Sequence, residues 1–152
     1  MKRRHFLAAV TAGALPALAQ QPPFQRFQPA QDINPLLQKL TGGVAPERGG
    51  VEIELPQIAE NGNSVPMRVR VASPMSVQDH VTAIHIIAER NPRPLVVTFH
   101  LGPQSGRAEV GTRVRLAGTQ TVTVLAALSG NRFRMAQTDV LVTAAACLDE
   151  SL

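Results

Sequence analysis

Hydrophobic and polar residues alternate along most of the chain after residue 50, with the period of two that is typical of a half-buried β-strand. Val51, Ile53 and Leu55 are separated by glutamates, and later segments repeat this pattern. Polar breaks such as Asn61-Gly62 and Gly130-Asn131 separate the runs, as turns do. Strands are therefore expected at residues 51–55, 65–71, 81–88, 95–101, 109–116, 121–128 and 139–143, with 133–136 as an alternative beginning of the last.

About seven short strands, each with one solvent-exposed face and one buried face, favour an all-β fold of the antiparallel β-sandwich type. The chain has no tryptophan and one cysteine, so it lacks the tryptophan and disulfide that pin the cores of antibody domains. The core is therefore expected to consist of Val, Leu, Ile and Ala.

A helical period precedes the strands. Ile33, Leu36, Leu37 and Leu40 follow an i, i+3, i+4, i+7 pattern, which predicts a short helix that packs its apolar face across the sandwich. Asp32 is expected to cap its start, and Gly42-Gly43 to end it. Residues 20–32 are rich in Gln and Pro without an apolar period, which indicates a flexible leader.

Residues 1–19 have the pattern of an export signal. Lys2, Arg3 and Arg4 form a basic start, residues 6–15 are an apolar run too short to span a bilayer, and Ala17-Leu18-Ala19 is a small-x-small cleavage site. The letters RRHFL match the twin-arginine pattern R-R-x-F-L, with an ordinary Sec signal as the alternative. The sequence therefore predicts a periplasmic protein exported in its folded state by the twin-arginine route.

Cleavage after residue 19 changes the charge of the chain. It removes three of the 15 basic residues and none of the 11 acidic ones, so the formal net charge falls from +4 to +1. Nucleic-acid binding loses its main compositional support. No later stretch approaches 18 apolar residues, so no membrane span is expected.

The only cysteine, Cys147, lies near the end of the sequence. In an oxidising compartment, an unpaired cysteine indicates a reactive thiol or an intermolecular bond. If the last strand ends near residue 143, the backbone at Cys147 can stand about 14 Å from the domain. The domain is thus predicted at 33–143 and a slim carrier arm at 144–152. Position alone leaves two alternatives, a covalent carrier or an incidental thiol.

The other candidates for chemistry favour structural interpretations. His80, His85 and His100 lack the spacing of a metal or catalytic motif, and a satisfied or exposed strand histidine is the preferred interpretation. A copper or zinc site built from these histidines and Met75 is the weaker alternative. Neither a metal nor a bound cofactor is expected.

Charged residues on the strands are expected to pair with one another. Glu52 and Glu54 share one strand face, and Arg68 with Arg70, or Arg113 with Arg115, could pair with them across strands.

From Val51 onward the chain resembles the SoxY family, the sulfur-carrier Y subunits of the periplasmic thiosulfate-oxidising (Sox) system. The twin-arginine leader fits the same family. The matching blocks are LPQIAENGNSVP at 55–66, SPM at 73–75, DHVTAIHI at 79–86, ERNPRP at 89–94, TFH at 98–100 and AEVGTRVRLA at 108–117.

This resemblance implies an immunoglobulin-like subunit that forms a heterodimer with a second β-sandwich protein, SoxZ. It also implies that Cys147 holds thiosulfate-derived sulfur covalently, so the protein is a carrier and not an enzyme. A Sox cytochrome loads the thiol oxidatively, a hydrolase removes sulfate, and a sulfane dehydrogenase oxidises what remains. The alternative is a periplasmic immunoglobulin-like adaptor whose cysteine is incidental or forms a dimer.

The residues around Cys147 depart from the family pattern. The family typically ends in Gly-Gly-Cys-Gly-Gly, whereas here alanines precede the cysteine and Leu148-Asp149-Glu150 follow it. Alanine restricts the backbone where glycine would not. Nearby negative charges disfavour the thiolate, so the pKa of Cys147 is expected to be raised. A divergent carrier for another sulfur donor is therefore an alternative.

Overall fold

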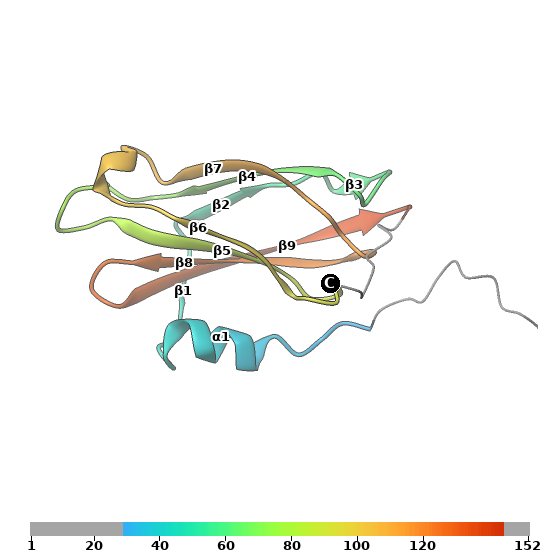
Figure 1. Ribbon diagram of the computed structural model, residues 1–152, viewed down its shortest axis with the longest axis horizontal. Coiled ribbons are helices and arrows are strands. Elements are labelled where there is room, and N and C mark those ends of the chain that lie inside the picture. The colour runs from blue at the N-terminus through green and yellow to red at the C-terminus, as the bar shows by residue number, and fades with distance from the viewer. Residues whose placement is uncertain (1–28, 145–152) are drawn as a thin grey trace, which may run out of the picture.

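The computed structural model describes residues 29–144, which form two β-sheets stacked face to face with one helix beneath them (Figure 1). A six-stranded sheet has the order β1-β9-β8-β5-β6, with β3 also paired to β9, and a three-stranded sheet has the order β2-β4-β7. The strands are β1 (Glu47–Arg48), β2 (Val51–Glu54), β3 (Ile58–Ala59), β4 (Val65–Val71), β5 (Val81–Ala88), β6 (Leu95–His100), β7 (Glu109–Val114), β8 (Gln120–Leu128) and β9 (Arg132–Val142).

The predicted β-sandwich is confirmed, and the seven longer strands pair antiparallel. The two expected pieces at 133–136 and 139–143 are parts of one strand, β9. The two-residue strands β1 and β3 were not expected, and both run parallel to β9. Strands this short carry no alternation that a sequence pattern could reveal.

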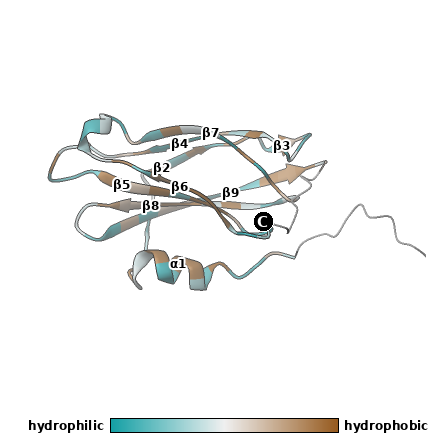
Figure 2. Ribbon diagram, viewed as in Figure 1, coloured by the Kyte–Doolittle hydropathy of each residue, from teal (hydrophilic) through white to brown (hydrophobic). Residues whose placement is uncertain are grey.

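The space between the sheets is filled by small aliphatic side chains, as the composition predicted. Ile84, Ile86 and Val124 of the larger sheet and Val69 of the smaller one are fully buried in this core. Figure 2 shows the hydrophobic stretch along β5, a central strand of the larger sheet. Burial of one such side chain contributes roughly 1.5–3 kcal/mol, so this layer is the main source of stability.

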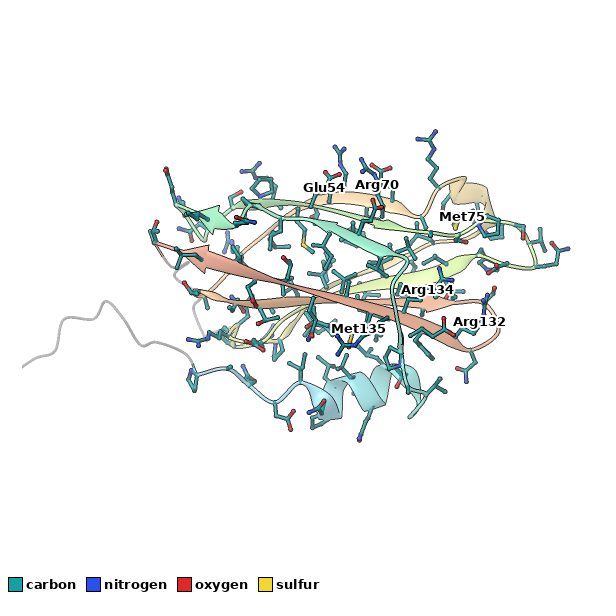
Figure 3. The ribbon with its side chains drawn as sticks, turned by 180° about the vertical axis from the view of Figure 1, so that it is seen from behind. Glu54, Arg70, Met75, Arg132, Arg134 and Met135 are labelled. Atoms are coloured by element: carbon teal, nitrogen blue, oxygen red, sulfur yellow. The ribbon has the colours of Figure 1, made fainter. Side chains whose placement is uncertain are left out.

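The expectation of one solvent-exposed face per strand is wrong for the two central strands, β5 and β8. Almost every residue of β5 and β8 is buried, on both faces of the sheet. Leu125 and Phe133 are buried but lie outside the core between the sheets. The reason is the helix α1 (Asn34–Thr41), which lies beneath this outer face (Figure 1), and Figure 3 shows Met135 of β9 on the same side.

The N-cap of the helix is Ile33, one residue after the expected cap, Asp32. The Ile33 side chain makes no capping bond, while Asp32 accepts a hydrogen bond at Oδ1 from the Asn34 N–H at 2.9 Å. The predicted end is confirmed, because Gly42 adopts φ +63° and donates its N–H to the Gln38 carbonyl. The apolar face stays only half-buried.

Of the predicted leader, residues 29–32 fall within the described part of the chain. Gln31 donates its backbone N–H to the Glu89 carbonyl at 2.9 Å and its side-chain N–H to the Asn91 carbonyl at 2.6 Å. These bonds hold the chain against the β5–β6 loop before α1 begins. Between residues 29 and 144, α1 is too short to cross a membrane, and no other α-helix is present.

Candidate functional site at the end of strand β9

The predicted site residue, Cys147, lies outside the described residues, and so does the predicted arm after Ala144. The predicted signal peptide at 1–19 is likewise outside them. What the structure describes is the base from which the chain continues toward the cysteine. This base is the end of β9, beside β3 at one end of the sandwich (Figure 1).

Hydrogen bonds secure the end of β9 from two sides. The Val142 N–H donates to Thr119 Oγ1 at 3.0 Å, from the loop before β8. The Thr143 N–H donates to the Ala59 carbonyl at 3.0 Å, which continues the pairing of β9 with β3. The strand end is therefore hydrogen-bonded to the sandwich from both sides.

Gly62 holds the last described residue. Its N–H donates to the Ala144 carbonyl at 2.7 Å, and its own carbonyl accepts from the Leu116 N–H at 2.8 Å. The Asn61-Gly62 pair was predicted only as a turn, and the structure adds that it anchors the chain. Cys147 is the third residue after Ala144 in the sequence.

Two arginines flank this anchor. Arg113 Nε donates to Ser64 Oγ at 2.6 Å, and Arg113 Nη2 donates to the Ser64 carbonyl at 3.0 Å. Arg115 is exposed and precedes Leu116, the residue bonded to Gly62. Arg113 therefore bonds to Ser64 and not to Glu52 or Glu54, the pairing that the sequence also allowed.

Of the expected pairs, the structure has Glu54 with Arg70, whereas Arg68 pairs with Glu109. Arg70 Nη1 contacts Glu54 Oε1 at 2.7 Å on the outer face of the smaller sheet (Figure 3). Glu109 also contacts Arg70 at 3.3 Å and Arg68 at 3.6 Å. The hydrogen bond and charge of Glu109, followed by the charge of Glu54, raise the pKa of Arg70. These ion pairs are exposed, so each contributes little to stability.

A shallow cleft of about 620 Å³ lies along the C-terminal half of β9. Its lining includes Glu89, Arg90, Thr121 and Asp139. Thr121 Oγ1 donates to Asp139 Oδ1 at 2.7 Å, and the Thr121 N–H donates to Glu89 Oε1 at 3.4 Å. These bonds between lining residues order the polar wall of the cleft.

Beneath this cleft, Asn91 and Gln120 form a buried polar network. Asn91 Nδ2 donates to the Arg115 carbonyl at 2.8 Å, and Asn91 Oδ1 accepts from the Ala117 N–H at 3.0 Å and from Gln120 Nε2 at 3.2 Å. The network connects the β5–β6 loop with the β7–β8 loop and the start of β8. Sequence analysis missed it because the polar pattern of a loop does not reveal which backbone groups a buried amide will meet.

The histidines have structural surroundings. His85 is 8% exposed, and its Nδ1 lies 2.9 Å from Thr98 Oγ1. Burial, and secondarily the charge of His100, lower the pKa of His85. His80 Nδ1 lies 3.1 Å from the Ser76 carbonyl. The preferred interpretation of satisfied strand histidines is thus confirmed for His85.

Within the described part of the chain, the three histidines of the metal alternative do not form a cluster. Between residues 29 and 144, no three His, Cys, Asp or Glu side chains are grouped so that they could hold a metal ion. Met75 is buried, and its sulfur accepts a hydrogen bond from the Val81 N–H at 3.4 Å.

Solved structures with similar folds include a sulfur carrier. The structure of the sulfur carrier protein SoxY from Chlorobium limicola f thiosulfatophilum is 28% identical with a TM-score of 0.62, covering 72% of this chain and 90% of that chain. A superoxide reductase (neelaredoxin) from Ignicoccus hospitalis is 15% identical with a TM-score of 0.56, covering 62% of this chain and 80% of its own. A putative superoxide reductase from Thermotoga maritima is 17% identical with a TM-score of 0.55, covering 64% of this chain and 93% of its own. The reductases show a shared fold alone.

A comparison with curated proteins found no match. A family model described as sulfur oxidation protein SoxY matches residues 37–147, which is most of the chain and reaches the cysteine position. Together with the two-sheet fold, this match confirms the family that the sequence blocks indicated. The chain belongs to the SoxY family of sulfur oxidation proteins.

Proposed function

We propose that this protein is a periplasmic sulfur carrier of thiosulfate oxidation, which holds sulfur covalently on Cys147 and presents it to separate enzymes. One observation carries the proposal: the family match runs to residue 147, the position of the only cysteine. The solved SoxY of Chlorobium limicola is described as a sulfur carrier protein, which supports a carrier role over an enzymatic one.

The base of the Cys147 segment suits a carrier. Gly62 and Ala59 hold the chain at Ala144 and Thr143, so the segment starts from a rigid point of the sandwich. The cysteine is only three residues further, close enough for the body to be recognised together with the sulfur. Several enzymes can then dock on the same surface and reach the same atom, which is what a shared carrier requires.

The proposed chemistry balances in two steps. In the first, Cys147–S⁻ and S₂O₃²⁻ form Cys147–S–S–SO₃⁻ and release two electrons to a haem protein. One sulfur–sulfur bond forms, and the thiol and thiosulfate sulfurs are oxidised. In the second, water cleaves the sulfonate, which gives Cys147–S–S⁻, SO₄²⁻ and two protons. The thiolate is the nucleophilic form in the first step, and the acidic residues after Cys147 disfavour it by like-charge repulsion, so loading should be slower than with uncharged neighbours.

The partners and location belong to the same proposal. A SoxZ-like β-sandwich subunit is the expected heterodimer partner, and Sox cytochrome, hydrolase and sulfane dehydrogenase are the transient ones. The RRHFL pattern supports twin-arginine export to the periplasm. An exposed apolar pair, Ile58 at 60% and Leu141 at 49%, lies in register where β3 meets β9 and offers such partners a contact near the base of the segment.

Intact mass spectrometry tests the carrier role directly. After incubation with thiosulfate and its haem-containing loading enzyme, the wild-type protein should gain the mass of one thiosulfate on Cys147, and reductant should remove it. Cys147→Ser should gain nothing, because a hydroxyl forms no such bond. A serine variant that gains the same mass would refute the assignment of the site.

The adaptor alternative predicts a different redox form of the cysteine. Material taken from the periplasm under native conditions and run without reductant should be a monothiol or sulfur adduct if the protein is a carrier. A disulfide-linked dimer as the main species would favour the adaptor.

A further inference from the structure

Strand β6 differs from the other strands that end a sheet. The larger sheet ends in β1 and β6, and the smaller one in β2 and β7. Charged side chains lie on β1, β2 and β7, namely Glu47, Arg48, Glu52, Glu54, Glu109 and Arg113. The sequence of β6, LVVTFH, contains no Asp, Glu, Lys, Arg, Pro or Gly. Proteins usually place charges or proline on an edge strand to prevent pairing with another chain, so β6 lacks the usual protection.

Backbone groups on one side of β6 are free to pair. Within residues 29–144, β6 pairs with β5 on one side and with no strand on the other (Figure 1). The Leu101 N–H donates to the Thr82 carbonyl at 3.0 Å, directly after the strand. Since alternate residues of an antiparallel strand bond to the same neighbour, Phe99 also bonds toward β5. The backbone groups of Thr98 and His100 therefore point away from the sheet.

Apolar side chains at this edge are incompletely covered. Val97, Phe99 and Leu101 pack against the core between the sheets, yet all three are only half-buried. In the smaller sheet β2 contacts β9 and β8, so β7 lies on the side of the sandwich that β6 borders. Val110 of β7 is half-buried as well. An apolar strand from another chain would bury the remaining surface of these residues, which is favourable.

We propose that this edge pairs with β6 of a second copy of the chain, antiparallel about a two-fold axis at Thr98. In an antiparallel pair, residues whose backbone groups point toward the partner strand must oppose one another. Centring the pair on Thr98 meets this condition and uses the free groups of Thr98 and His100 in both copies.

The sequence of β6 is complementary to itself in this register. Val97 lies opposite Phe99 of the second copy, and Thr98 lies opposite Thr98. Pairs of a β-branched with an aromatic residue, and of threonine with threonine, are favourable across strands. Because β6 carries no Asp, Glu, Lys or Arg, the pairing brings no like charges of the strand together.

The size of the contact predicts a reversible dimer. A six-residue edge is about 20 Å long and, with the side chains of both faces, about 20 Å deep, so pairing buries about 800 Å² in total. This area is at the low end for specific complexes, and a dissociation constant of about 10–100 μM is expected. The inference goes beyond the proposed carrier function and makes no use of the thiol of Cys147.

Charges placed at the two-fold axis test the pairing. All proteins carry Cys147→Ser, so that no disulfide can join two copies. Thr98→Lys and Thr98→Glu each place two like charges opposite one another, and each should raise the dissociation constant about ten-fold in about 10 mM salt, measured by sedimentation equilibrium. An equimolar mixture of the two variants should form dimers again, and native mass spectrometry should find one copy of each variant in them.

Matched variants separate the edge from the rest of the molecule. Thr143→Lys adds the same charge directly after β9, which β8 and β5 separate from β6, and should leave the dissociation constant unchanged. The Thr98 variants also lose the contact with His85, so a second test is needed if they lower the melting temperature. His100 is exposed, and His100→Pro removes an N–H that faces the free edge, which should weaken the dimer about ten-fold. His100→Gln keeps this N–H and should associate like the parent protein.

Three results would overturn the proposal. The parent protein could stay monomeric up to about 1 mM, the dimer could survive unchanged in the Thr98 and His100→Pro variants, or cross-linking in the periplasm could join β6 to a different subunit in place of a second copy. None of these results depends on thiosulfate loading of Cys147. The carrier function and the β6 dimer can therefore fail independently.

Discussion

His85 is a buried ionisable residue, so its protonation is coupled to folding. It is enclosed on the outer face of the larger sheet, in register with Leu125 of β8 and bonded to Thr98 of β6. Burial removes water from the imidazolium and so disfavours the charged form. The same enclosure that makes it a poor metal ligand therefore makes it a pH-dependent element of stability.

The pKa of His85 is lowered in the folded protein, so the unfolded chain binds its proton first as pH falls. The stabilisation is fully present above the unfolded pKa of about 6.5 and is lost as pH falls toward the folded pKa. Denaturant unfolding between pH 8 and pH 5 should show this loss for the wild type. His85→Gln, which can still bond to Thr98, should show a flatter pH profile; an identical profile would contradict the prediction.

At the scale of elements, the end of β9 is defined by contacts that come from three separate segments. The β7–β8 loop supplies Thr119, β3 supplies Ala59, and the following turn supplies Gly62. None of these is adjacent to β9 in sequence, so the base of the Cys147 segment depends on tertiary pairing. Loosening any of them should affect the strand end before the rest of the sandwich.

Thr119→Val tests this anchoring. The variant removes the oxygen that accepts from the Val142 N–H and leaves that mostly buried donor without this partner, at a cost of about 1–3 kcal/mol. Amide exchange at Val142 should accelerate, and the free energy of unfolding should fall. Thr119→Ser keeps the oxygen and should retain slow exchange. Equal protection in Thr119→Val would show that β3 alone holds the strand end.

At the scale of the whole molecule, Asn91 in the β5–β6 loop is bonded to the segment before α1, to the β7–β8 loop and to the start of β8. Asn91 is 5% exposed and bonds Arg115, Ala117 and Gln120 through its side chain, while its carbonyl accepts from Gln31. Satisfied networks of this kind specify a unique arrangement, and partly satisfied ones are costly. The position of Arg115 beside the site thus depends on a residue far from it in sequence.

Asn91→Ala should lower the free energy of unfolding by roughly 2–4 kcal/mol, because it leaves several buried partners unpaired at once. Gln31→Ala removes only the bond to the Asn91 carbonyl and should cost about 1 kcal/mol. Urea denaturation of both variants measures the difference. Comparable losses in the two would mean that the side-chain network of Asn91 contributes little.

The alternation of Val, Ile and Leu with polar residues determined by itself that the chain forms a β-sandwich, because side chains of a strand face opposite sides with a strict period of two. The seven longer strands could be predicted for that reason, and the end of α1 could be predicted because glycine readily adopts the left-handed conformation that ends a helix. The block from Leu55 to Pro66 together with the block from Asp79 to Ile86 was specific enough to indicate the family. Cys147 could be singled out because it is the only thiol, a property of composition that needs no coordinates.

Only the tertiary structure decided which residues surround the base of the Cys147 segment. Hydrogen bonds from Gly62 and Thr119, the bond of Arg113 to Ser64 and the network of Asn91 all join positions more than 20 residues apart. Burial on both faces of β5 and β8 likewise depended on where α1 came to lie. Periodicity reports the environment of a residue along its own strand, whereas these contacts depend on how separate strands and loops meet in space.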